Sequence, residues 1–255
     1  MAITIKSDRD IEKMKVAGHV VSVCHQRVQA AVAPGVTTGE LDAIVVDTLK
    51  EHNALASFLG YNGFPASICA STNEEIVHGF PGKRVLSHGD IISIDIGAIV
   101  DGWHGDSAWT YAVGDVSPEA QQLLDDTEQA LELAVAQAIP GNRLGAIGHA
   151  VEQFAAPRGY GIVRGYGGHG IGRRMHEDPH VPNYGSAQYG PVLRKGMTFA
   201  IEPMLNIGTD DTRVLDDDWT VVTADGSLSA HFEYTIAITN GEPLILTPRL
   251  ISVVH

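Results

Sequence analysis

The 255-residue sequence predicts an α+β fold made of two related halves around a central antiparallel sheet. In each half, capped amphipathic helices precede strand-like apolar runs, and matching residues recur at a nearly constant spacing. Pro34-Gly35 recurs as Pro140-Gly141 after 106 residues, and Asp95 is matched by Glu202 after 107. Such a duplication predicts a pseudo-two-fold axis that brings Asp95 and Glu202 together. We therefore expect one domain over residues 1–255, with internal halves of about 7–115 and 116–247.

The helices are predicted from their first residues and from their apolar spacing. In the first half, Ser7 can cap a helix that ends near Pro34-Gly35, and Thr38 opens the next helix. In the second half, Ser117-Pro118 starts a helix that runs towards Pro140-Gly141. The apolar face of the following helix contains Leu144, Ile147, Val151 and Phe154. Both halves are thus expected to begin with two helices.

A β-hairpin is predicted between Ile91 and Tyr111, because Asp101-Gly102 is a strong two-residue turn signal. A turn at this point pairs Asp95 with Ala108 and places Asp106 on the same face of the hairpin. Buried carboxylates must be paired, hydrogen-bonded, protonated or bound to metal, so the two acids could share one ligand. The alternative is that Asp106 lies in a polar turn and Asp95 accepts a hydrogen bond from a neighbouring Ser or Thr.

Charge and composition exclude several classes of protein. The chain has 17 basic and 31 acidic residues and a net charge of −14, which opposes binding to nucleic acid or to an anionic membrane. The N-terminal sequence does not resemble a signal peptide, and no run of about 18 apolar residues is present, so we expect a cytoplasmic protein. Cys24 and Cys69 cannot form a disulfide framework and are expected to be reduced.

Three further polar residues lie in strand-like or turn-like contexts, namely His78, His169 and Glu233. Taken singly, a buried His is more often a hydrogen-bonded core residue, and a Glu in a strand usually faces water. The segment after the G-x-G-x-x-G at residues 165–170 contains Pro179 and Pro182 and has no acid near Gly185. A dinucleotide-binding site needs a helix and an acid there, so this motif is not expected to bind a dinucleotide. The H-E-x-x-H at residues 176–180 contains Pro179 and cannot form the helix of a zinc protease.

Five segments carry the remaining polar residues, in the order NEEIVHGFP, IDIGAIVDGWHGD, GHGIGRRMHEDP, MTFAIEPML and SAHFEYT. Together they resemble the motifs of the bacterial type I methionine aminopeptidases, and the likeness covers nearly the whole chain. The resemblance implies the pita-bread fold, which agrees with the internal repeat. It also implies a dinuclear metal centre with five ligands, namely Asp95, Asp106, His169, Glu202 and Glu233.

The resemblance further implies how these ligands are shared. Asp106 and Glu233 match the bridging acids, Asp95 matches the chelator of one ion, and His169 and Glu202 match the ligands of the other ion. Four carboxylates supply a charge of −4 against the +4 of two divalent ions. This donor set suits Mn, Fe, Co or Zn and does not distinguish among them.

The implied reaction is removal of an N-terminal methionine that precedes a small residue, by a water activated between two metal ions. Glu202 resembles the general base, His78 a group near the substrate amine, and His176 the donor to the developing oxyanion. The substrate-binding residues by this resemblance are Phe58, Tyr61, Phe64, Cys69, His78, Met175, His176 and Trp219. Phe58 and Met175 replace the Cys and Phe of many relatives, which puts the pocket size in question.

The expected partner is the N-terminal peptide of a nascent protein. We expect a monomer with no membrane partner and no direct nucleic-acid specificity, and a transient ribosome contact stays open. Two other classes stay open as alternatives. One is an Xaa-Pro peptidase of the same fold, although such relatives usually have an additional N-terminal domain. The other is a catalytically silent pita-bread protein, which would be marked by the loss of metal ligands.

Overall fold

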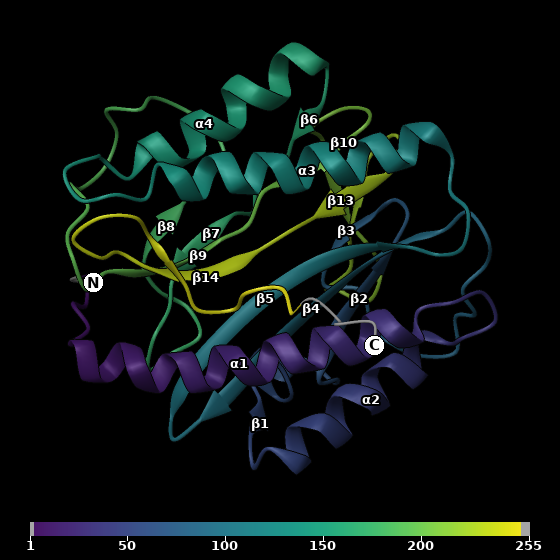
Figure 1. The fold of residues 1–255 in the computed structure, drawn as a ribbon. Helices are drawn as coiled ribbons and strands as arrows, with labels where there is room; N and C mark the ends of the chain where they lie inside the picture. Colours follow the sequence, from purple (N-terminus) through teal and green to yellow (C-terminus); the bar gives the residue numbers. More distant parts are fainter. Residues whose placement is uncertain (1–2, 251–255) are drawn as a thin grey trace.

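The computed structural model describes residues 3–250, in which two helix pairs lie on opposite sides of the strands in Figure 1. The first pair is α1 (Asp8–Ala31) and α2 (Thr38–Glu51), and the second is α3 (Pro118–Ala136) and α4 (Gly145–Ala155). Short 3₁₀ turns, η1 (Tyr61–Gly63) and η2 (Ala156–Arg158), follow each pair. Each half therefore begins with two helices, as predicted.

The predicted helix starts are confirmed by their caps. The Ser7 hydroxyl accepts the backbone N–H of Asp10 at 3.2 Å, and the Asp10 carboxylate accepts the backbone N–H of Ser7 at 3.1 Å. Thr37 caps α2 with the same reciprocal pattern through Glu40, and Ser117 caps α3 ahead of Pro118. These bonds satisfy backbone donors that have no partner within the first turn of a helix.

The first half contains a sheet in the order β1-β4-β2, with β5 paired to the long strand β4. Its strands are β1 (Leu55–Ala56), β2 (Ile68–Thr72), β4 (Ile91–Val100) and β5 (Trp103–Ala112). The second half contains a sheet in the order β15-β14-β9-β7-β8. Its strands are β15 (Leu244–Ile245), β14 (Tyr234–Ala237), β9 (Thr198–Ile201), β7 (Gly168–Gly170) and β8 (Glu177–Val181).

Two smaller three-stranded sheets complete the described fold. One has the order β13-β10-β6 and the other the order β11-β12-β3. Their strands are β13 (Ser229–His231), β10 (Met204–Asn206), β6 (Gly161–Ile162), β11 (Thr212–Val214), β12 (Val221–Thr223) and β3 (Glu75–Val77). The short strand β3 ends directly before His78, one of the predicted site residues.

The hairpin of β4 and β5 has the predicted register, with Asp95 opposite Ala108 and Gly97 opposite Asp106. Asp101 and Gly102 both have positive φ, at 49° and 73°, as a tight turn between twisted strands requires. Asp106 lies inside β5 and is 2% exposed, so the alternative that it belongs to a polar turn is wrong.

Strand β5 also joins the two halves. The backbone N–H of Glu233 donates to the Ala108 carbonyl at 2.8 Å, and that of Asp106 donates to the Thr235 hydroxyl at 3.0 Å. The largest buried apolar cluster contains residues from α1 and β4 together with residues from α3, β9 and β14. The division into halves of about 7–115 and 116–247 within a single domain stays a prediction.

Helix α1 packs closely on β5 through two glycines. A side-chain carbon at Gly105 would lie 2.8 Å from the backbone nitrogen of Gly18, which is too close for any larger residue. The contact therefore fixes the strand that carries Asp106. Within residues 3–250, Cys24 and Cys69 are buried free thiols, and none of the helices is long and apolar enough to cross a bilayer.

Candidate active site

A cavity of about 250 Å³ opens between the two halves and is lined by every predicted site residue. Its walls contain the five predicted metal ligands, the two predicted non-ligand histidines and the predicted apolar residues, together with one residue that was not predicted, Asn62. The side chains come from segments as far apart in sequence as Phe58 and Glu233. Tertiary structure therefore brings the predicted set into one place.

Each predicted ligand residue lies in a strand or directly beside one. Asp95 lies in β4, Asp106 in β5 and His169 in β7, while Glu202 directly follows β9 and Glu233 lies between β13 and β14. Strands hold side chains on fixed faces, so these groups are placed before any ligand arrives.

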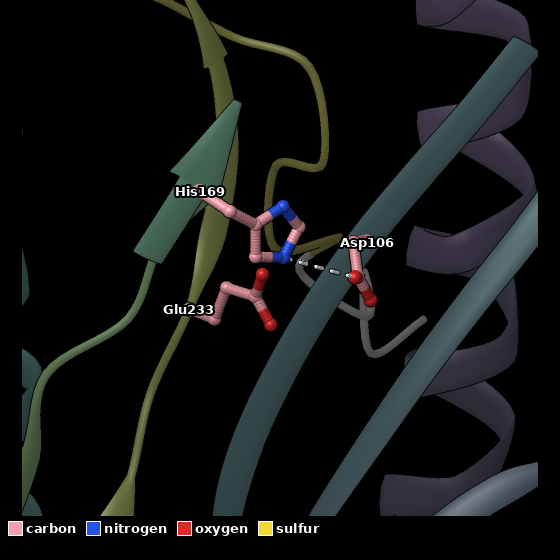
Figure 2. A group of neighbouring side chains, drawn as sticks. All are labelled: Asp106, His169 and Glu233. Atoms are coloured by element: carbon pink, nitrogen blue, oxygen red, sulfur yellow. Dashed lines mark ion pairs between the residues drawn. The ribbon is translucent and has the colours of Figure 1, made fainter. Parts of the chain in front are cut away.

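Three of the side chains form a tight group, shown in Figure 2. Asp106, His169 and Glu233 are buried and each offers a donor atom, and these atoms lie within 4.8 Å of one another. The His169 Nε2 atom is 3.9 Å from Oδ2 of Asp106 and 3.8 Å from Oε1 of Glu202. Asp95 and Glu202 lie outside the tight group but line the same cavity.

Without a bound cation, the buried carboxylates of the site repel one another. Burial, together with the neighbouring acids, holds the pKa of Asp106 and that of Glu233 well above their usual values. Burial also raises the pKa of Asp95 to about 7. Burial opposes ionisation of Glu202 as well, but the histidines at positions 231, 169 and 176 outweigh it and lower the pKa of Glu202.

The hydrogen bond made by His169 shows which of its nitrogens faces the acids. Nδ1 lies 3.0 Å from the Gly170 carbonyl, and a carbonyl oxygen can only accept, so Nδ1 carries the proton. The lone pair is therefore on Nε2, the atom that lies nearest to the carboxylates. This is the tautomer in which an imidazole binds a metal ion.

The donor set fits a divalent metal ion. Within residues 3–250, one buried oxygen of each of Asp95, Asp106 and Glu233 has no hydrogen-bond partner, namely Oδ1, Oδ1 and Oε1. Buried polar atoms are nearly always satisfied, so three unpaired oxygens at one place fit a binding site for a cation. Oxygen donors with a single imidazole suit a first-row divalent metal ion and bind softer ions less well.

Two histidines of the cavity are held in unusual ways. His78 has a φ of 63°, a backbone conformation that non-glycine residues rarely adopt and that is common at functional sites. His176 packs its ring against that of His169, with the centroids 4.2 Å apart. Burial and the neighbouring His169 lower the pKa of His176 to about 4, so its imidazole is neutral at neutral pH.

The other wall of the cavity is apolar. Phe58, Phe64, Cys69 and Met175 are all buried and form one cluster, against which Trp219 packs. The Phe64 ring meets the Trp219 ring edge-on, with the centroids 5.1 Å apart. Phe58 and Met175, the two residues that differ from many relatives of the resembled family, both contribute to this apolar wall.

The sequence interpretation missed His231 as a member of this site. It is 2% exposed, and its Nε2 atom is 3.5 Å from Oε2 of Glu202. Its position two residues before Glu233 in an alternating pattern was the available signal. Asn62 gave no such signal, because it lies in a 3₁₀ turn with φ of 48°.

A buried ion pair fixes the loop that carries Met175 and His176. Lys6 Nζ lies 2.6 Å from Oε2 of Glu177, and both side chains are almost fully buried. The other oxygen, Oε1, accepts the backbone N–H groups of Arg173 at 2.9 Å and Arg174 at 3.3 Å. The N-terminal segment thereby holds one wall of the cavity in place.

Comparison with known proteins decides the family, since residues 12–240 match metallopeptidase family M24. The chain is 51% identical over 246 residues to the methionine aminopeptidase of Clostridium acetobutylicum, which covers 96% of this chain and 98% of that protein. The chain belongs to family M24. Its structure matches the crystal structure of methionine aminopeptidase from Thermotoga maritima with a TM-score of 0.95 and 44% identity, over 96% of this chain and 99% of that chain.

Solved structures of lower sequence identity are similar to this chain in fold alone. The Xaa-Pro dipeptidase from Bacillus anthracis is 22% identical and aligns with a TM-score of 0.78, over 97% of this chain but only 63% of that chain. The fold of this M24 chain is therefore the predicted pita-bread fold, and its implied cofactor is divalent metal.

Substitution of Lys6 tests how much the buried Lys6–Glu177 ion pair contributes to the stability of this M24 chain. Lys6→Met leaves the Glu177 carboxylate buried without its cation, so we expect the free energy of unfolding to fall by about 3–5 kcal/mol. Arg164→Met is the matched control, because Arg164 forms an exposed pair with Asp210 at 2.7 Å and should cost at most about 1 kcal/mol. Urea denaturation measures both, and equal losses would contradict the expectation.

Proposed function

We propose that this chain is a methionine aminopeptidase, which hydrolyses the N-terminal methionine of nascent polypeptides whose second residue is small. The carrying observation is the position of the acid and imidazole cluster at one end of an apolar cavity of about 250 Å³. The apolar wall of this cavity would enclose one side chain, and the acids beside it would face the backbone of the same residue. The relatives named methionine aminopeptidase support the same assignment.

We assign two divalent ions to the five predicted ligands. The residues that would hold the ions are Asp95, Asp106, His169, Glu202 and Glu233. When bound, the ions would polarise the scissile carbonyl and lower the pKa of a shared water. The unpaired carboxylate oxygens and the Nε2 lone pair of His169 support this assignment.

The remaining roles belong to side chains. Glu202 keeps a lowered pKa because three histidines face it, so it is ionised and can accept a proton and pass it to the leaving amine. His176 donates an N–H to the oxygen on which negative charge develops, and His78 lies near the substrate amine and scissile nitrogen. The residues that would enclose the methionine side chain and keep bulk water away from it are Phe58, Tyr61, Phe64, Cys69, Met175 and Trp219.

Substrate preference tests the proposed function directly. The enclosed apolar wall should favour a flexible thioether, so Met-Ala-Ser should be hydrolysed far faster than Leu-Ala-Ser, and Met-Ala faster than Met-Lys. Assays use stripped protein with Mn, Fe, Co or Zn added separately. Equal release of Leu and Met, or faster cleavage of Ala-Pro-Ser, would replace this assignment with another M24 activity.

Chelation should abolish activity without unfolding the chain, because the ligand strands are already packed by both halves. Without metal the acids repel one another and several bind protons. Metal at 100 times its Kd should raise the free energy of unfolding by about 2.7 kcal/mol through binding to the native state. Circular dichroism, melting temperature and methionine release are measured together, and a chelated protein that stays active would contradict the metal assignment.

His169 and His176 should fail in different ways although they are seven residues apart. His169→Ala removes a ligand, so metal content should fall towards one ion or fewer per chain. His176→Ala should keep nearly two ions and lose roughly 10²- to 10³-fold in kcat, as expected for a missing oxyanion donor. Elemental analysis beside steady-state kinetics separates them. Metal loss from His176→Ala with a fully loaded His169→Ala would reverse the two roles.

A further inference from the structure

The hydroxyl of Tyr61 makes a contact that pocket lining alone does not explain. It lies 2.7 Å from Nδ1 of His176, and the two rings are 5.3 Å apart with a tilt of 41°. Among the described residues this is the hydrogen bond that engages the His176 ring. Tyr61 is partly exposed at the rim, whereas the His176 ring reaches inward to the ring of His169.

The turn that carries Tyr61 is held by the backbone and not by the hydroxyl. The Tyr61 N–H donates to the Phe58 carbonyl at 2.8 Å, and the Phe64 N–H donates to the Tyr61 carbonyl at 2.9 Å. Gly60 has a φ of 81° and its N–H donates to the Phe64 carbonyl at 2.8 Å. Loss of the hydroxyl therefore leaves the turn intact.

The hydrogen bond decides which nitrogen of His176 keeps a proton. A neutral imidazole carries one N–H, and the partner of one nitrogen fixes the state of the other. A phenol is the stronger acid of the pair and an imidazole nitrogen the stronger base, so the favoured direction is O–H to Nδ1. The proton of His176 then lies on Nε2.

We propose that Tyr61 is a positioning residue that holds His176 in the Nε2–H tautomer, so that this N–H is available to donate to a substrate oxygen. The proposal rests on the proposed function for its catalytic consequence, but the tautomer itself does not. With the opposite tautomer, Nε2 would present a lone pair and could not donate at all. The contrast with His169 is direct, because a carbonyl leaves the lone pair on Nε2 there.

The tautomer is measured by two-bond ¹H–¹⁵N correlation on the full-length chain labelled with ¹⁵N-histidine and loaded with Zn²⁺, which is diamagnetic. His176 is assigned from the signals that disappear in His176→Ala. We expect a pyridine-type Nδ1 and a pyrrole-type Nε2 in the wild type, and loss of that preference in Tyr61→Phe. A pyrrole-type Nδ1 in the wild type, or an unchanged ring in Tyr61→Phe, overturns the proposal.

Kinetics test whether the hydroxyl acts through His176. Tyr61→Phe keeps the ring, so KM for Met-Ala-Ser should stay nearly constant while kcat falls roughly 2- to 10-fold. In the His176→Ala background the same change should cost nothing further, because the group it positions is gone. An equal loss in both backgrounds would overturn the positioning role.

The matched control is Tyr160→Phe, which removes a hydroxyl that donates to Asp126 at 2.8 Å, away from the cavity. It should alter neither the His176 signals nor kcat. Failure of the proposed function appears differently, since a wild type that does not release methionine can still show the Nε2–H tautomer. A wild type that releases methionine with a proton on Nδ1 would refute this inference alone.

Discussion

The structure depends on the burial of four like-charged carboxylates at one point. Asp95 and Asp106 come from a hairpin of the first half, whereas Glu202 directly follows strand β9 and Glu233 directly precedes strand β14 of the second half. Their mutual repulsion and desolvation oppose folding unless cations are bound. The surrounding fold must therefore be stable without help from the acids. The capped helices, the close α1–β5 contact and the shared apolar cluster supply that stability.

The same repulsion explains why the cavity has two chemically different ends. At one end the acids need a cation and are shielded by histidines at positions 169 and 231. At the other end Phe58, Phe64 and Met175 make a wall without charge. In the proposed function, a peptide with an apolar first side chain would satisfy both ends at once, because its amine and carbonyl would lie beside the acids. The preference for the N-terminal residue of a peptide substrate thus follows from the geometry proposed for the site.

Two imidazoles in ring contact have different Nδ1 partners, and the roles proposed for them differ accordingly. His169 faces a backbone carbonyl, which only accepts, and so presents a lone pair to the acids. His176 faces a hydroxyl, which can donate, and so can keep its proton on Nε2. In the proposed site, one imidazole would thereby be a metal ligand and the other a hydrogen-bond donor. The Lys6–Glu177 pair keeps the loop of His176 where this difference matters.

The sequence by itself determined the local structure and predicted a set of site residues that the fold brings into one cavity. Helix caps at Ser7 and Ser117, the Asp101-Gly102 turn and the facing of Asp95 and Ala108 depend on neighbours in the chain, and all were predicted correctly. The five motifs contain the five predicted ligands together with His78, Met175 and His176, whereas the other predicted lining residues lie outside them, namely Phe58, Tyr61, Phe64, Cys69 and Trp219. These features are readable because short-range backbone geometry and residue type decide them.

Only the tertiary structure decided how these residues meet. His231 was missed as a neighbour of Glu202, and the bond from Tyr61 to His176 joins residues 115 positions apart. The same holds for Lys6 and Glu177, which lie 171 positions apart and share no pattern in the sequence. Such contacts are set by how strands and loops pack in three dimensions, and hydrogen-bond direction depends on distances of a few tenths of an ångström. Residue order alone carries no information at that scale.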